Sequence, residues 1–271
     1  DYWAANFLKE LDRHLHNRRQ FHINKLEESI KTVIFDAYQH SKKRLIILDY
    51  DGTLMPFHVD PLAVFPDHHL IDLLLRLTLD QNNKMVINSG RDKQTLEDWL
   101  GHLGIDLAAE HGVWLKDSTE WRRTPGLSSD WKNDVRAALE NIVERTPGSF
   151  IEEKSYSLVW HYRKVEEGLG DLRANEIDSN LRMLAADKGL QLMPGNKVIE
   201  FKNVEVNKGK ATLNWLYGNN PDFILALGDD HTDEDIFKVL PDDAISIKIG
   251  SNISAAKYFL TDHKEVRKLL W

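Results

Sequence analysis

Three short apolar runs, each ending abruptly in polar residues, constrain the fold of this chain most strongly. Leu45–Leu48 runs into Asp49, residues 84–87 run into Asn88, and Phe223–Leu227 runs into Gly228-Asp229. Continuous apolar runs of this length are typical of strands that are covered on both faces. Helical patterns that would supply the covers lie between them, at 70–79, 94–100 and 210–217. We therefore predict an α/β fold with a doubly wound, Rossmann-like parallel sheet.

Between residues 113 and 202 the pattern changes to hairpins and two amphipathic helices, near 129–145 and 169–188. The α/β alternation then resumes, with a further strand at 244–249. We expect a core made of 41–112 and 203–271, with an inserted α+β cap domain at 113–202. Residues 1–40 have helical spacing and are expected to form a helical segment ahead of the core.

The string Asp49-Tyr50-Asp51-Gly52-Thr53 follows the first strand, where doubly wound sheets bind ligands. A carboxylate can attack phosphorus when a metal ion and fixed donors neutralise the charge it approaches, giving an aspartyl phosphate that water cleaves. Asp51 is placed to protonate the leaving oxygen and then to deprotonate that water. The alternative is an acidic turn that caps a helix.

A second acidic string, residues 228–235, contains Asp229, Asp230 and Asp233. Carboxylates that converge with Asp49 would repel one another unless a cation joined them. Oxygen ligands and an anionic substrate favour Mg²⁺. The alternative is a helix N-terminus whose acidic residues complement the helix dipole.

Three further residues suit the same chemistry. Ser89 ends a predicted strand and could donate a hydrogen bond to a phosphate oxygen, although a serine there is also a common cap. Arg91 could support the site through an ion pair. Lys208, in a Gly-containing loop, would hold both the phosphate and Asp49, or else be a solvated surface lysine.

Composition excludes several classes of function. The chain has 35 Lys+Arg and 43 Asp+Glu, and a net charge of −8 is the wrong sign for a nucleic-acid-binding protein. The longest apolar stretch, 70–79, is interrupted by Asp72 and Arg76, so we expect no membrane span. The absence of cysteine fits a reducing compartment, and we expect a cytoplasmic protein. Because the sequence starts at Asp1 with no basic-then-apolar leader, we expect a processed or excised piece.

These strings, in this order, resemble the four motifs of the haloacid dehalogenase superfamily of Mg²⁺-dependent phosphatases. The resemblance implies an inserted cap domain, and a nucleophile and an acid/base drawn from the first motif. The residues it assigns to catalysis are Asp49, Asp51, Ser89 and Lys208, and those it assigns to the metal site are Asp49, Asp51, Asp229 and Asp233.

The predicted cap carries two hairpins. If the chain reverses at Ser155-Tyr156, residue 152 faces 159 and 150 faces 161, which puts Glu152, Lys154 and His161 on one face. The apolar residues Ile151, Leu158, Trp160 and Tyr162 then occupy the other face. A second hairpin, turning near 194–196, puts Glu200 opposite Ile199 and Phe201. A face of mixed charge suits a polyhydroxyl ligand, although it could also be the solvated side of an amphipathic sheet.

Glu152-x-Lys154, His161-Tyr162-Arg163, the string 197–200 and Glu110-His111-Gly112 together resemble the trehalose-6-phosphate phosphatase family. The resemblance implies trehalose 6-phosphate as substrate. The residues we expect to bind it are Arg91, His111, Glu152, Lys154, Arg163 and Glu200. Residues 3–8 resemble the closing helix of trehalose-6-phosphate synthase domains, which suggests a covalently linked synthase domain. Alternatives are another sugar phosphatase of this superfamily, or a noncatalytic domain that binds trehalose 6-phosphate.

Overall fold

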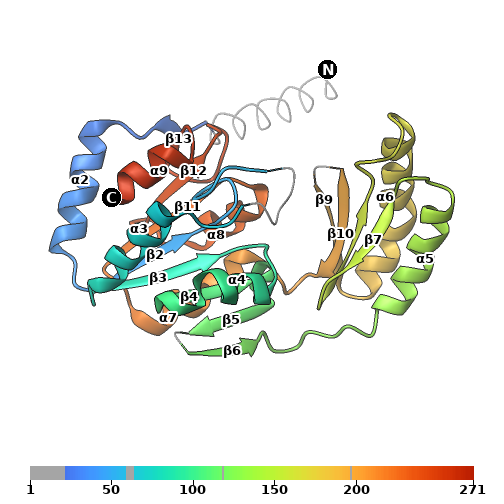
Figure 1. Ribbon diagram of the computed structural model, residues 1–271, viewed down its shortest axis with the longest axis horizontal. Coiled ribbons are helices and arrows are strands. Elements are labelled where there is room, and N and C mark those ends of the chain that lie inside the picture. The colour runs from blue at the N-terminus through green and yellow to red at the C-terminus, as the bar shows by residue number, and fades with distance from the viewer. Residues whose placement is uncertain (1–21, 59–63, 118, 196) are drawn as a thin grey trace, which may run out of the picture. The chain divides into compact units, whose positions relative to one another are not determined.

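The predicted strands form the centre of a nine-stranded sheet in the computed structural model, which describes residues 22–58, 64–117, 119–195 and 197–271 (Figure 1). The strand order is β1-β13-β12-β11-β2-β3-β4-β5-β6, and neighbours from β1 through β4 run parallel. The bounds are β1 Asn24–Lys25, β2 Arg44–Leu48, β3 Asn83–Asn88, β4 Asp106–Ala109, β5 Trp114–Asp117, β6 Glu120–Arg123, β11 Phe223–Gly228, β12 Ile245–Ile249 and β13 Tyr258–Leu260.

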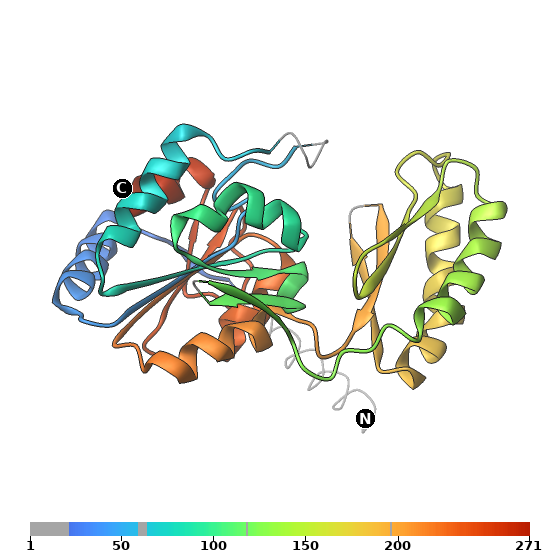
Figure 2. The same ribbon diagram turned by 60° about the horizontal axis from the view of Figure 1, so that its bottom comes forward.

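Helices cover both faces of this sheet, as predicted. Ile46 and Leu48 of β2 face one core with α2, α3, α4 and α9, whereas Leu45 and Ile47 face the other with α7 and α8. Figure 2 shows α3, in teal, and α7, in orange, on opposite sides of the sheet. The bounds are α2 Glu28–His40, α3 His68–Leu79, α4 Lys93–Leu100, α7 Lys208–Asn219, α8 Glu234–Val239 and α9 His263–Leu270, with short 3₁₀ turns η2 Gly101–Leu103, η3 Glu110–Gly112 and η4 His231–Asp233.

Residues 123–206 form a second compact unit with its own core. Its four-stranded antiparallel sheet has the order β7-β8-β10-β9, and α5 and α6 pack on one face. Phe150 pairs with His161 and Glu152 with Val159, which is the predicted hairpin register. The bounds are α5 Lys132–Glu144, β7 Phe150–Glu153, β8 Ser157–His161, α6 Leu169–Asp187, β9 Leu190–Gly195 and β10 Val198–Asn203. No helix in the described residues is long and apolar enough to cross a membrane.

The structure differs from the sequence prediction at two boundaries. The expected insertion began at residue 113, but β5 pairs antiparallel with β4 and extends the larger sheet, so the smaller unit begins at Arg123. Within the described part of the expected helical segment 1–40, residues 28–40 are helical as α2, whereas Asn24–Lys25 pairs with β13 as an edge strand and Leu26 is buried in the larger core. Residues 3–8 lie outside the described residues.

Candidate active site

Three neighbouring parallel strands bring candidate catalytic residues to one edge of the larger sheet. β2 is followed directly by Asp49, β3 by Ser89 and β11 by Asp229. Since β11, β2 and β3 are adjacent and parallel, their carboxyl ends lie side by side. Asp233 in η4 and Lys208, the first residue of α7, complete the group.

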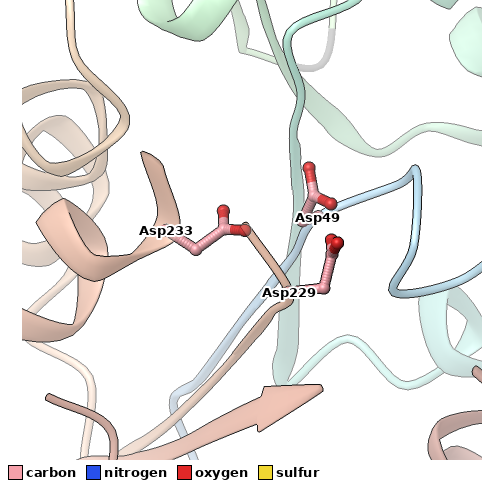
Figure 3. Close-up of side chains that lie close together, drawn as sticks. All are labelled: Asp49, Asp229 and Asp233. Atoms are coloured by element: carbon pink, nitrogen blue, oxygen red, sulfur yellow. The ribbon is translucent and has the colours of Figure 1, made fainter. Parts of the chain in front are cut away.

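Asp49, Asp229 and Asp233 form an acidic cluster (Figure 3). One carboxylate oxygen from each lies within 4.8 Å of the oxygens of the other two. The ammonium group of Lys208 donates to Asp49 Oδ1 at 2.6 Å and to Asp233 Oδ1 at 2.7 Å, and all three of these residues are buried. Lys208 therefore contacts the expected nucleophile directly instead of lying at the surface.

The charges in this cluster do not balance, because three carboxylates face one ammonium group. Burial raises the pKa of Asp49 well above its ordinary value, and it raises the pKa of Asp229 to about 6. Burial opposes the charged form of Lys208 too, but Asp233 and Asp49 outweigh that effect and raise its pKa. A largely buried, all-oxygen ligand set with excess negative charge fits a hard divalent cation such as Mg²⁺.

A glycine sets the approach of the first motif to this cluster. Gly52 has a left-handed φ of +81°, and a Cβ there would lie 2.2 Å from Asp229 Oδ2. Glycine is thus required both by the turn and by the close passage of the Asp229 carboxylate.

The pKa of Asp229 predicts how Mg²⁺ affects stability. The pKa of Asp229 is about 6 in the folded protein, above its ordinary 3.8, so the folded state favours the protonated carboxyl group. Without metal, the contribution of Asp229 to folding stability is therefore fully present below pH 3.8 and is lost as the pH rises through 6. A Mg²⁺ ion bound by this carboxylate would have to displace that proton below pH 6 but not above it. Mg²⁺ should therefore raise the melting temperature clearly more at pH 7.5 than at pH 5, as measured by differential scanning fluorimetry. An equal increase in melting temperature at both pH values would contradict the binding of Mg²⁺ by Asp229.

Asp51 lies outside the acidic cluster, although we expected it among the metal ligands. Both of its carboxylate oxygens accept hydrogen bonds from Arg91, Nε to Oδ2 at 2.8 Å and Nη2 to Oδ1 at 2.6 Å. The Arg91 guanidinium, expected to bind substrate, is thus paired with the expected acid/base residue.

Ser89 and its neighbour Asn88 are both buried at the end of β3. The Ser89 hydroxyl oxygen accepts the Arg91 backbone N–H at 3.2 Å, which leaves the hydroxyl hydrogen available to a ligand. Asn88 Nδ2 donates to the Lys208 carbonyl at 3.0 Å and so fixes the start of α7. Asn88 is not among the residues predicted from the sequence; its signal is an amide side chain at the polar end of an apolar strand.

His111 lies in a strained turn beside the Ser89–Arg91 loop. Glu110 and His111 have positive φ values of +50° and +57°, which cost free energy in residues other than glycine. The His111 backbone N–H donates to the Ser89 carbonyl at 3.0 Å, and a Cβ on Gly90 would lie 2.6 Å from the His111 ring. The structure thus packs the imidazole against Gly90, and its contact with the sugar stays a prediction.

The remaining predicted residues lie in the smaller unit. Glu152, Val159 and Glu200 are paired across β7, β8 and β10, so their side chains share one face of that sheet. Leu158, Trp160 and Phe201 are buried on the opposite face, against α5 and α6. Glu152 Oε2 lies 2.7 Å from His161 Nε2 on the polar face. Lys154 lies at the hairpin end, where its backbone N–H donates to the Ser157 carbonyl, and Arg163 follows β8 and is exposed.

Comparison with known proteins identifies the family. The family model described as trehalose-phosphatase matches residues 47–264. The chain belongs to the trehalose-phosphatase family. This confirms the resemblance inferred from the motifs of the larger and smaller units, and the related phosphatase structures confirm the predicted fold class.

Named members of this family and related structures match nearly the whole chain. The trehalose-phosphatase of Saccharomyces cerevisiae is 32% identical over 99% of this chain and 35% of its own length. The bifunctional trehalose-6-phosphate synthase/phosphatase of Thermoproteus tenax is 33% identical over 98% of this chain and 36% of its own length. The chain therefore spans about a third of the length of these relatives. The C-terminal domain of Candida albicans trehalose-6-phosphate phosphatase is similar in structure, with a TM-score of 0.81, 30% identity, and coverage of 92% of this chain and 96% of that domain.

Proposed function

We propose that this chain hydrolyses trehalose 6-phosphate to trehalose and inorganic phosphate, with Mg²⁺ as cofactor and Asp49 as nucleophile. One observation carries the proposal: in a member of the trehalose-phosphatase family, Asp49 is buried at a strand end, held by Lys208, beside carboxylates suited to a divalent cation.

The reaction proceeds in two steps. A carboxylate oxygen of Asp49 attacks phosphorus, the bond from phosphorus to the sugar oxygen breaks with its electron pair on that oxygen, and Asp51 supplies the proton that makes the sugar hydroxyl. Water then attacks the phosphorus of the aspartyl phosphate, and Asp51 takes a proton from that water. The bond from phosphorus to the Asp49 oxygen breaks with its electron pair on that oxygen, which restores the Asp49 carboxylate and frees inorganic phosphate.

Several groups stabilise the charge that develops on the phosphoryl oxygens. Lys208 is fixed by two carboxylates and cannot turn away, and the Ser89 hydroxyl hydrogen is available for donation. Asp49, Asp229 and Asp233 would hold Mg²⁺, which when bound supplies positive charge to the phosphoryl group and offsets the cluster's excess negative charge.

We assign recognition of the sugar to the smaller unit. Glu152 and Glu200 lie on its polar sheet face, Lys154 lies at the hairpin end, and Arg163 is the second residue after β8. Carboxylates accept hydrogen bonds from sugar hydroxyl groups, and lysine and arginine side chains donate hydrogen bonds to the hydroxyl oxygens. Such contacts act on the sugar alone, so their removal should affect sugar phosphates selectively.

Glu152→Gln and Glu200→Gln are expected to lower kcat/KM for trehalose 6-phosphate at least about tenfold more than for p-nitrophenyl phosphate. The matched control is Glu153→Gln, because Glu153 is the next residue of β7 but bonds Lys132 and Arg136 on the helix-covered side. Equal losses on both substrates in the Glu152 and Glu200 variants would contradict sugar recognition by this face.

Phosphate release from a panel of sugar phosphates tests the whole proposal. We expect trehalose 6-phosphate to be hydrolysed fastest, with activity lost in EDTA and restored by Mg²⁺. A preference for sucrose or mannosyl phosphates would replace the substrate assignment. Binding of trehalose 6-phosphate without phosphate release would show a noncatalytic domain instead.

We also propose that this chain is joined to a synthase domain in its full-length protein. The relative from Thermoproteus tenax is named a bifunctional synthase/phosphatase, and this chain matches only 36% of it. An antibody raised against this chain should then detect, in its source, a polypeptide far longer than 271 residues.

A further inference from the structure

The pairing of Arg91 with Asp51 is unusually well fixed. Arg91 Nε and Nη2 each bond a different oxygen of the Asp51 carboxylate, which is the two-pronged geometry that only a guanidinium provides. The Arg91 side chain is 8% exposed, so little water competes for these bonds.

Two aromatic rings hold the guanidinium in place. Its central carbon lies 4.5 Å from the ring centre of Trp99 and 5.4 Å from that of Tyr50. Both rings are buried, and the Tyr50 hydroxyl donates to the Val64 carbonyl at 2.8 Å. Cation–π contacts with buried rings therefore restrain the Arg91 side chain independently of Asp51.

The backbone of Arg91 is fixed as well. Its N–H donates to the Ser89 hydroxyl oxygen at 3.2 Å, and its carbonyl accepts the Glu110 N–H at 2.8 Å. Arg91 is therefore held by backbone hydrogen bonds, by cation–π contacts with its guanidinium group and by the bidentate hydrogen bonds to Asp51. The Asp51 side chain, by contrast, is 28% exposed, and among the described residues its carboxylate accepts hydrogen bonds from Arg91 alone.

We propose that Arg91 is a positioning residue that aims the Asp51 carboxyl at the leaving oxygen, rather than a phosphate-binding residue. This inference rests on the proposed function, in which Asp51 supplies the proton to that oxygen. Protonation by a general acid accelerates the departure of a basic leaving group more than that of a weakly basic one. A nitrophenolate leaves without a proton, whereas a phenolate or a sugar alkoxide needs one. A phosphate-binding residue would instead act equally on every ester.

The experiment compares kcat/KM for ring-substituted phenyl phosphates in the wild type and in Arg91→Lys. kcat/KM reports the steps from substrate binding to departure of the leaving group. It therefore excludes the later attack of water on the aspartyl phosphate, a step that is the same for all esters. These substrates carry no sugar, so sugar contacts do not contribute. We expect the loss caused by Arg91→Lys to grow at least about tenfold from p-nitrophenyl to unsubstituted phenyl phosphate.

Arg44→Lys is the matched control. Arg44 is also buried, bonds Asp80 at 2.5 Å and lies 4.0 Å from the ring centre of Tyr38, but it is at the opposite end of β2 from Asp49. We expect Arg44→Lys to lower the melting temperature without changing the dependence on the leaving group. Trp99→Leu removes one aromatic contact of Arg91. Its loss in kcat/KM should also grow from p-nitrophenyl to phenyl phosphate, but less than in Arg91→Lys. If Arg91→Lys does not fold, Trp99→Leu provides the test.

The outcomes separate the two proposals. A loss that is uniform across the ester series in Arg91→Lys, or in Trp99→Leu if only that variant folds, would overturn the positioning role and leave the phosphatase assignment intact. A wild-type protein that releases phosphate neither from these esters nor from trehalose 6-phosphate would overturn the proposed function, and the positioning role with it.

Discussion

The Asp49→Asn variant is expected to release phosphate from trehalose 6-phosphate at least about 1,000-fold more slowly than the wild type. An amide oxygen is a far weaker nucleophile than a carboxylate, and no aspartyl phosphate can then form. The amide is nearly the same size as the carboxylate, and it can still accept the hydrogen bond from Lys208. The loss should therefore appear in turnover, measured by phosphate release with Mg²⁺ present, while the melting temperature shows that the variant is folded.

Asp230→Asn is the matched control for this prediction. Asp230 is next to Asp229, but its side chain is 52% exposed and bonds His231 instead of joining the acidic cluster. Asparagine also caps helices well, so the local turn should survive. We expect near wild-type turnover. Asp49→Asn retaining more than a few per cent of activity, once contaminating phosphatase is removed, would rule out Asp49 as the nucleophile.

Lys208→Met should impair both catalysis and stability. Removing one partner of a buried ion pair costs about 3–5 kcal/mol, because the remaining charge is left buried and uncompensated. Here two carboxylates, those of Asp49 and Asp233, lose their donor at once. Turnover should fall at least about 100-fold, because a fixed positive charge at the transferring phosphoryl group is lost. Urea denaturation and phosphate release measure the two effects separately.

Mg²⁺ should restore part of the stability that Lys208→Met loses, since a divalent cation neutralises the same carboxylates. Lys116→Met is the control, because Lys116 is equally buried in the larger unit but pairs with Glu97. We expect that variant to be destabilised to the same degree with and without Mg²⁺, and to remain active. A Lys208→Met deficit that Mg²⁺ leaves unchanged would argue against a metal at this cluster.

The strands of the larger sheet could be predicted because both of their faces are buried. Leu45–Leu48 and Phe223–Leu227 are continuously apolar for that reason, and their ends coincide with the polar residues that form the site. The 155–156 hairpin could be predicted because a two-residue turn fixes the pairing of Glu152 with Val159. In each case a local pattern carries enough information to specify the structure.

Other features depend on contacts that are distant in the sequence. The sequence suggested that Arg91 supports the site through an ion pair, but Asp51 and Arg91 are 40 residues apart, and neither string identifies Asp51 as the partner or the bidentate geometry. The extension of the larger sheet beyond residue 113 depends on pairing between β5 and β4, not on a change in composition. The left-handed backbone of Glu110 and His111 was equally hidden, because positive φ values are uncommon in residues other than glycine.

The smaller unit is a single uninterrupted stretch of chain, Arg123–Val206, with its own apolar core, and every strand of the larger sheet lies outside it apart from the last residue of β6. Natural selection could therefore exchange or reshape this stretch without disturbing the pairing of β11, β2 and β3. With sugar recognition assigned to the smaller unit as proposed, a scaffold connected in this way allows new substrate preferences to evolve as insertions, while the ester-cleaving chemistry is inherited unchanged.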